Sequence, residues 1–159
     1  MGMGQKDYVN SVNLNRNTVF PYLVLNVVND DSYPGNPGFQ VMHWHEDLQF
    51  IYVLSGEIVV ATLEMQTPVY AGEGIFLNKN VVHLVKKNST CHYNSFIFPD
   101  YFLKFYFGSP AGEIVERLVG KENFPIFIPK IGKNTLRCGK RCRRSLPWKR
   151  RRRRCMSMR

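Results

Sequence analysis

Short apolar runs alternate with clusters of glycine, proline, asparagine and aspartate along residues 20–128 of the chain. Runs of about four to eight residues at close, regular spacing are typical of strands in an all-β barrel or sandwich. The predicted strands cover residues 20–28, 39–45, 48–54, 57–65, 69–70, 75–77, 81–85, 91–98 and 124–128. Residues 48–54 are apolar on both faces, so we expect this strand to be covered on both sides.

One segment has helical periodicity. Apolar residues recur at helical spacing from Ile114 to Val119. Ser109 and Pro110 precede them as an N-cap and a first-turn proline, and Gly120 follows as a stop signal. The pattern therefore predicts one short helix beside the strands. We expect residues 1–19 to form an N-terminal arm and residues 20–130 to form one domain, since a chain of 159 residues is typical of a single domain.

Charge divides the chain into two parts. Residues 130–159 contain 14 of the 22 basic residues and none of the 12 acidic ones, which leaves a net charge of −4 on residues 1–129. An unbroken arginine run covers residues 150–154. A segment with so little apolar periodicity cannot bury enough surface to fold alone, so residues 131–159 are predicted to be a disordered basic tail. Two explanations remain open: an out-of-frame translation, which we prefer, and a genuine tail for nucleic acid or an acidic partner.

The remaining composition indicates a cytoplasmic protein. No stretch approaches the roughly 20 apolar residues of a transmembrane helix, so no membrane partner is expected. The polar N-terminus lacks the apolar core of a signal peptide. Cys91 is the one cysteine before the tail, and it is predicted to be a buried free thiol.

The four histidines supply the candidate chemistry. His43 and His45 are separated by one residue, and His83 lies within a later apolar run. Alternate side chains of a strand point to the same face, so His43 and His45 share a face if their segment is extended. Gln49 adds an amide nearby, and the four residues predict a polar cluster inside the sheet. His92 follows a polar loop, and we expect it to be exposed at a strand edge.

The spacing of these residues resembles the two motifs of the cupin superfamily. The first motif is His-x-His, three residues, Glu or Gln, six residues and Gly, and its slots hold His43, His45, Gln49 and Gly56. The second is Gly, five residues, Pro-x-Gly, two residues and His, and its slots hold Gly72, Asn78, Asn80 and His83. Asn78 and Asn80 thus replace proline and glycine. The resemblance covers residues 20–100, and it is greatest to the N-terminal ligand-sensing and dimerisation domain of AraC-type transcription regulators.

The resemblance implies a cupin barrel, a jelly-roll or double-stranded β-helix, with His43, His45, Gln49 and His83 facing its interior. These four residues are the candidate ligand-binding site. Three neutral imidazoles also suit a divalent transition metal, although Gln49 stands where cupins usually have a carboxylate ligand. The alternative is a polar pocket whose groups hydrogen-bond one another or a sugar hydroxyl without any metal. No nucleophile has a base at a recognisable spacing, so no catalytic residue is predicted.

The preferred hypothesis is a ligand-sensing cupin domain of an AraC-type regulator that lacks its helix-turn-helix domain. Its partners would be a small-molecule effector, such as a sugar, and a second copy of the chain in a homodimer. DNA would be bound through the missing domain, or without sequence preference through the basic tail. The alternative is a small metal-dependent cupin enzyme, an isomerase or dioxygenase, that uses the same three histidines.

Overall fold

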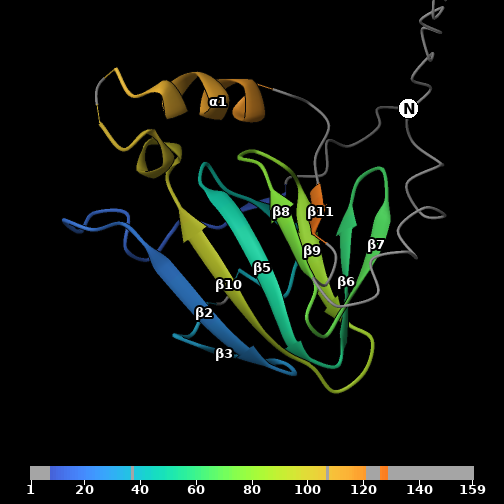
Figure 1. The fold of residues 1–159 in the computed structure, drawn as a ribbon. Coiled ribbons are helices and arrows are strands. Elements are labelled where there is room, and N and C mark those ends of the chain that lie inside the picture. Colours follow the sequence, from blue (N-terminus) through green and yellow to red (C-terminus); the bar gives the residue numbers. More distant parts are fainter. Residues whose placement is uncertain (1–7, 37, 107, 121–125, 129–159) are drawn as a thin grey trace, which may run out of the picture.

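The strands form two sheets that pack face to face (Figure 1). The computed structural model describes residues 8–36, 38–106, 108–120 and 126–128. One sheet has the order β11 (Ile126–Ile128), β8 (Gly74–Leu77), β5 (Leu48–Ser55), β10 (His92–Phe98), β2 (Leu23–Val28) and β3 (Asp31–Tyr33). The other has the order β1 (Val9–Asn10), β4 (His43–Trp44), β9 (His83–Lys87), β6 (Glu57–Thr62) and β7 (Gln66–Tyr70). The all-β prediction is confirmed.

The core lies between the two sheets and is built from alternate positions of the strands. Along β10, buried and half-buried residues alternate from end to end, as expected for a strand with one face toward a core. Fully buried Ile51 and Ile75 come from one sheet, and fully buried Ile58, Val60 and Val69 come from the other. Apolar side chains of both sheets therefore meet in a single cluster, which fixes the spacing of the layers.

The outer face of the strand β5 is covered only at its start, where Leu48 is fully buried, so the expectation of burial on both faces is wrong for the rest of the strand. Ile51 and Val53 are fully buried, whereas Tyr52 is 38% exposed and Leu54 is 43% exposed. The outward face is apolar because its rings pack along the sheet: the Phe50 ring stacks on that of Phe96 of β10, with centroids 6.0 Å apart. The apolar residues on the outer face of β5 pack against side chains of the neighbouring strand and not against a second layer.

This difference predicts unequal costs for two neighbouring substitutions. Ile51→Ala should lower the free energy of unfolding by about 2–5 kcal/mol, because it leaves a cavity in the core. Tyr52→Ala should lower it by about 1 kcal/mol, because much of that ring already contacts water. Urea denaturation followed by circular dichroism measures both. Equal losses for the two variants would mean that the outer face is covered in solution.

The predicted strand at residues 39–45 is mostly absent. Only His43 and Trp44 pair, and residues 39–42 form a turn and a bend. The Phe39 N–H donates to the carbonyl of Asn36 at 3.2 Å, and the Gln40 amide donates to the carbonyl of Asp30 at 2.7 Å. The first bond satisfies a main-chain group that a strand would have paired with its neighbour, and the second ties the turn to Asp30. The other predicted strands occur, with ends that differ by a few residues.

The strand β3 lies outside the predicted strands. It pairs with β2 after a tight reversal at Asn29, which has a φ of 56°. Asparagine tolerates this left-handed conformation, and its side-chain oxygen accepts the N–H of Cys91 at 3.1 Å. Cys91 itself is buried and free, as predicted.

Part of the segment predicted as an N-terminal arm is attached to the domain. The strand β1 runs parallel to β4, and the Ser11 N–H donates to the carbonyl of Trp44 at 2.8 Å. Asn13 is buried, and its amide donates to the carbonyl of Pro21 at 3.1 Å. Residues 8–21 therefore cover one edge of the sheet that contains His43 and His83.

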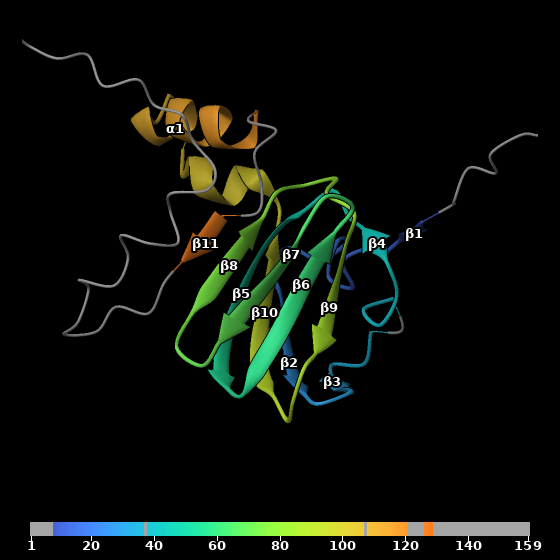
Figure 2. The same cartoon turned by 90° about the vertical axis from the view of Figure 1, so that its right-hand side faces the viewer.

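A 3-10 helix, η1 (Asp100–Lys104), and the predicted helix, α1 (Pro110–Val119), lie together at one end of the sheets (Figures 1 and 2). Val115 of α1 is buried. No helix in the described part of the chain is long and apolar enough to cross a membrane. The predicted basic tail, residues 131–159, lies outside the described residues.

Candidate ligand- and metal-binding site

Three histidines and one glutamine converge between the two sheets. His43 on β4 and His83 on β9 are direct cross-strand partners, and His45 follows β4 on the same face. Gln49 comes from β5 in the opposite sheet. The four side chains are buried, with exposed fractions of 4% or less. The structure thus brings together all four residues that the sequence identified as a candidate site.

The imidazole rings are in mutual contact. Ring centroids are 4.4 Å apart for His43 and His83, 5.2 Å for His45 and His83, and 6.1 Å for His43 and His45. One ring nitrogen from each histidine lies within 4.8 Å of the others. None of the described aspartates and glutamates belongs to this group. The cluster is therefore a set of three nitrogen donors without a carboxylate.

Each ring is held in the same way by the backbone. The Nδ1 atom of each histidine lies within hydrogen-bond distance of a main-chain carbonyl two residues away in the sequence. These contacts are His43 with Val41 at 2.7 Å, His45 with Asp47 at 2.9 Å and His83 with Val81 at 2.8 Å. A carbonyl can only accept, so Nδ1 carries the proton and Nε2 of a neutral ring keeps its lone pair. Metal-binding histidines are commonly fixed by such a bond from the other ring nitrogen.

His83 has an unsatisfied nitrogen. Among the described residues, its Nε2 is the one buried side-chain nitrogen or oxygen without a hydrogen-bond partner. Burial, together with the neighbouring His43 and His45, lowers the pKa of His83 to about 3. Burial also lowers the pKa of His43. Both rings are therefore neutral at physiological pH, and Nε2 of His83 keeps a free lone pair in a place where an unmade hydrogen bond is unfavourable.

Gln49 connects the histidines to β10. Its Nε2 atom donates to Ser95 Oγ at 2.7 Å, and its Oε1 atom lies 3.1 Å from Nε2 of His45. Two lone pairs at that distance repel unless a proton or a cation lies between them. If the amide is turned by half a rotation, its N–H donates to His45 and its oxygen accepts the Ser95 hydroxyl. The side chain thus has one orientation suited to the free site and another suited to a bound cation.

The space beside the cluster is small. A cavity of about 10 Å³ lies among His43, Gln49, Ser95, Tyr93 and Phe39. That volume is close to the minimum for one water molecule, so an organic effector such as a sugar needs additional room.

The donor set fits a divalent transition metal. His43, His45 and His83 would hold it through Nε2, and Gln49 would contribute a neutral oxygen, which binds cations less strongly than a carboxylate does. The fit rests on the three anchored rings and the unsatisfied nitrogen of His83. A bound ion would supply a Lewis acid to an oxygen atom of a ligand.

The two departures from the second cupin motif have structural explanations. Asn80 has a φ of 64°, the left-handed conformation that suits the family's glycine and that asparagine tolerates. Its N–H donates to the carbonyl of His45 at 2.8 Å, which ties this turn to the first motif. Asn78 is buried, and its amide donates to the carbonyl of Val119 at 2.8 Å. Asn78 therefore joins the site's turn to the end of α1.

Three residues near the site differ from the sequence analysis: one is placed differently and two were not predicted. His92 is half-buried rather than exposed, and its Nε2 accepts a hydrogen bond from the Asn26 amide at 2.8 Å on the outer face of the sheet. Sequence reasoning missed Tyr93 and Ser95 as lining residues. Strand alternation could have found them, because they precede the buried Ile97 at intervals of two.

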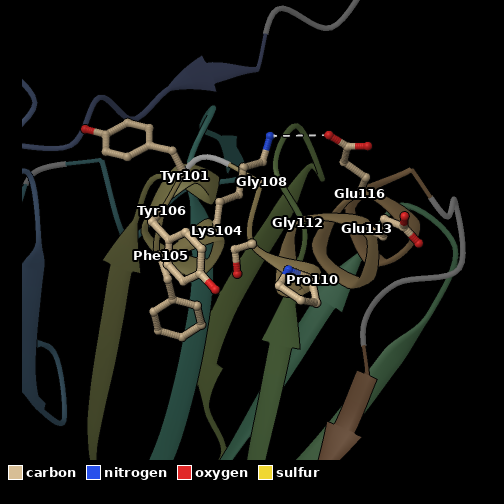
Figure 3. Close-up of a pocket in the computed structure, with 10 residues that line it drawn as sticks. Tyr101, Lys104, Phe105, Tyr106, Gly108, Pro110, Gly112, Glu113 and Glu116 are labelled. Carbon is tan, nitrogen blue, oxygen red and sulfur yellow. Dashed lines mark ion pairs between the residues drawn. The ribbon is translucent and has the colours of Figure 1, made fainter.

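A larger hollow lies away from the histidines, between η1 and α1 (Figure 3). Its volume is about 900 Å³, and its walls include Tyr101, Phe105 and Tyr106. An ion pair between Lys104 and Glu116, 3.8 Å apart, spans it. The hollow is open to solvent and contains none of the candidate site residues.

Comparison with known proteins places the site in a family. Residues 32–94 match the family model described as "Cupin domain". This segment is a cupin domain. The matched residues include the three clustered histidines and Gln49. Two solved structures are similar to the chain. ToxT from Vibrio cholerae has a TM-score of 0.43 and 15% identity, and the match covers 71% of this chain and 43% of ToxT. Oxalate decarboxylase from Bacillus subtilis has a TM-score of 0.36 and 14% identity, and the match covers 70% of this chain and 34% of the decarboxylase.

One curated protein is similar in sequence to part of the chain. The uncharacterized HTH-type transcriptional regulator YdeC of Bacillus subtilis (strain 168) is 33% identical over 58 residues. The match covers 35% of this chain and 20% of the regulator, so the chain spans about a fifth of the length of the relative that it matches.

Proposed function

We propose that the chain provides the ligand-sensing domain of an HTH-type transcription regulator of the AraC kind. In this proposal, the buried histidine cluster binds the species to which the regulator responds. The observation that carries it is the 33% identity over 58 residues with the regulator YdeC. The cupin fold alone would not support it, because one fold hosts many functions. Formation of a homodimer and coupling to a DNA-binding domain belong to the same proposal.

The chemistry of the cluster favours binding over turnover. His43 and His83 are held neutral, and their Nδ1 protons are committed to backbone carbonyls. Gln49 and Ser95 are neutral groups that do not exchange protons at physiological pH. A sensor must bind and release its effector unchanged, and a set of neutral, fixed hydrogen-bonding groups meets that requirement.

A metal-dependent cupin enzyme is the second candidate. The three ring nitrogens within 4.8 Å of one another favour it. The substitution of the usual carboxylate by Gln49 speaks against it, because an amide can neither balance the charge of the ion nor act as a general base. Conversion of a substrate by the zinc- or manganese-loaded chain would support this candidate.

A chimera tests the sensing proposal. The segment of YdeC that matches this chain would be replaced by residues 8–128 of this chain, which contain all the described strands, and the chimera would be used in a reporter assay for that regulator. Divalent metals and carbon sources would be added to the medium in turn. We expect at least one addition to change reporter output about five-fold, and the double variant His43→Ala, His83→Ala to abolish that change. The matched control His92→Ala should respond normally. A response that survives loss of both cluster histidines would contradict the proposal.

A further inference from the structure

The small cavity beside the histidines shares a wall with a larger pocket outside it. The inner cavity is about 10 Å³, and the outer pocket is about 350 Å³. Phe39, Val85 and Tyr93 line both. A volume of 350 Å³ is within the range of small-molecule sites, whereas the inner cavity is far below it. Three side chains thus separate the histidines from a space of ligand size.

The outer pocket exists because one strand is shorter than its neighbour. The strand β9 runs from His83 to Lys87, but β4 pairs with it only at His43 and His83. The chain leading to β4 instead turns at Phe39 and runs past the flank of β9 (Figure 2). The pocket lies in this interruption of the sheet, between residues 84–87 and the turn at Asn29 and Asp30.

Of the three residues in the shared wall, Phe39 is the one that no strand pairing holds in place. Val85 is paired with Val60 across β6 and β9, and Tyr93 is paired with Val27 and Val53 on both sides of β10. Phe39 lies in a turn and is half-buried, packed against the edge of the core. A rotation of its side chain would join the two cavities without breaking a strand ladder.

The outer pocket has an excess of positive charge. Lys86 and Lys87 line it, opposed by Asp30, which forms an ion pair with Lys87. Both partners are well exposed, with side-chain exposed fractions of 46% and 63%, so the pair is weak and a ligand carboxylate could replace Asp30 at little cost. Tyr93, whose pKa burial raises, stays protonated as a donor at the shared wall.

We propose that the outer pocket is the binding site of a small organic carboxylate, which pairs with Lys87, displaces the Phe39 ring and reaches the histidine cluster. The proposal deepens the proposed sensing function and rests on it for its biological meaning. The ligand class follows from the two lysines at the opening and the apolar wall behind them. The ligand's apolar part would occupy the place of the Phe39 ring, beside His43, Gln49 and Tyr93.

Benzoate is a suitable probe for the full chain. Its binding would be followed through the ring signals of the histidines in ¹H–¹³C NMR spectra. We expect the His43 and His83 signals to shift with added benzoate and the His92 signal to stay in place, since His92 lies on the outer face of the sheet. His92 also reports whether each variant is folded.

Four variants test whether the ligand binds at Lys87 and passes Phe39 to reach the histidines. Phe39→Ala and the milder Phe39→Leu should tighten benzoate binding about five-fold or more, because the ligand no longer has to displace the ring. Lys87→Met should weaken it, and Asp30→Asn should tighten it, by about five-fold each, or roughly 1 kcal/mol. Lys104→Met is the matched control for a lost positive charge, and it should have no effect.

Two results would overturn the proposal. The first is that benzoate leaves the His43 and His83 signals unmoved in the wild-type chain and in Phe39→Leu. The second is that Lys87→Met and Asp30→Asn change the affinity in the same direction, which would indicate a structural effect of the ion pair. Failure of the sensing proposal gives a different result: benzoate binds as described, but the reporter chimera does not respond through the cluster.

Discussion

Zinc added to the metal-free chain should bind with a stoichiometry of about one, and His83→Ala should weaken that binding at least about 100-fold. The expectation follows from three rings whose Nδ1 atoms are held by backbone carbonyls and from the unpartnered Nε2 of His83. Loss of one of three nitrogen ligands removes a large part of the affinity of a zinc site. Isothermal titration calorimetry measures both the stoichiometry and the affinity.

The controls for zinc binding come from the chain itself. His92→Ala removes the fourth histidine, which lies outside the cluster, and it should leave the affinity unchanged. Cys138, Cys142 and Cys155 are thiols that could bind zinc on their own, so all three would be replaced by serine in every variant. Gln49→Glu should tighten binding about ten-fold, because a carboxylate adds a charged ligand next to His45. Equal affinities for the wild-type chain and His83→Ala would exclude the cluster as the zinc site.

The cluster could be predicted from the sequence because two regular features determine it. The alternation of a strand places His43 and His45 on one face, and the cupin motif spacing brings His83 beside His43. Regular spacing of apolar residues likewise made the short helix and most of the strands predictable. The role of these residues, as ligands of a metal or of an effector, does not follow from their positions.

Several features could not be predicted because tertiary contacts decide them. Periodicity suggested a strand at residues 39–45, but side-chain and main-chain bonds of Gln40 and Phe39 to nearby carbonyls hold a turn there. That turn creates the pocket beside β9. Tyr52 is apolar in pattern yet exposed, because stacked rings stabilise an outward face without a covering layer. The bond from Gln40 to Asp30 and the stacking of Phe50 on Phe96 join residues that are not neighbours in the sequence, so no local pattern predicts them.

Acidification of the chelator-treated chain should destabilise it steeply between about pH 6.5 and pH 4. The pKa of His83 falls from 6.5 to about 3 in the folded chain. In this interval the unfolded chain binds a proton at His83 that the folded chain does not, so the free energy of unfolding decreases as the pH falls. At about 1.4 kcal/mol per pH unit, this residue alone accounts for a loss on the order of 3 kcal/mol over the interval.

Other groups change the size of the effect but leave its sign unchanged over most of the interval. His43, whose pKa burial also lowers, adds to the loss. Asp47, whose pKa burial raises from 3.8, acts in the opposite direction near the lower limit, because the folded chain then binds its proton more readily. The contribution of Asp47 is retained in a variant that lacks only His83, whereas that of His43 changes with the loss of the neighbouring ring, 4.4 Å away.

A comparison of two histidine variants isolates the contribution of His83. Urea denaturation of the chelator-treated chain would be measured at pH 7, 6, 5 and 4 for the wild type, His83→Asn and His92→Asn. His83→Asn removes the buried imidazole, so its stability should depend much less on pH than that of the wild type. His92→Asn changes a half-buried histidine on the outer face and should keep the full pH dependence. If His83→Asn lost as much stability on acidification as the wild type, the buried cluster would not be the source of the effect, and the neutral state of His83 in the folded chain would have to be abandoned.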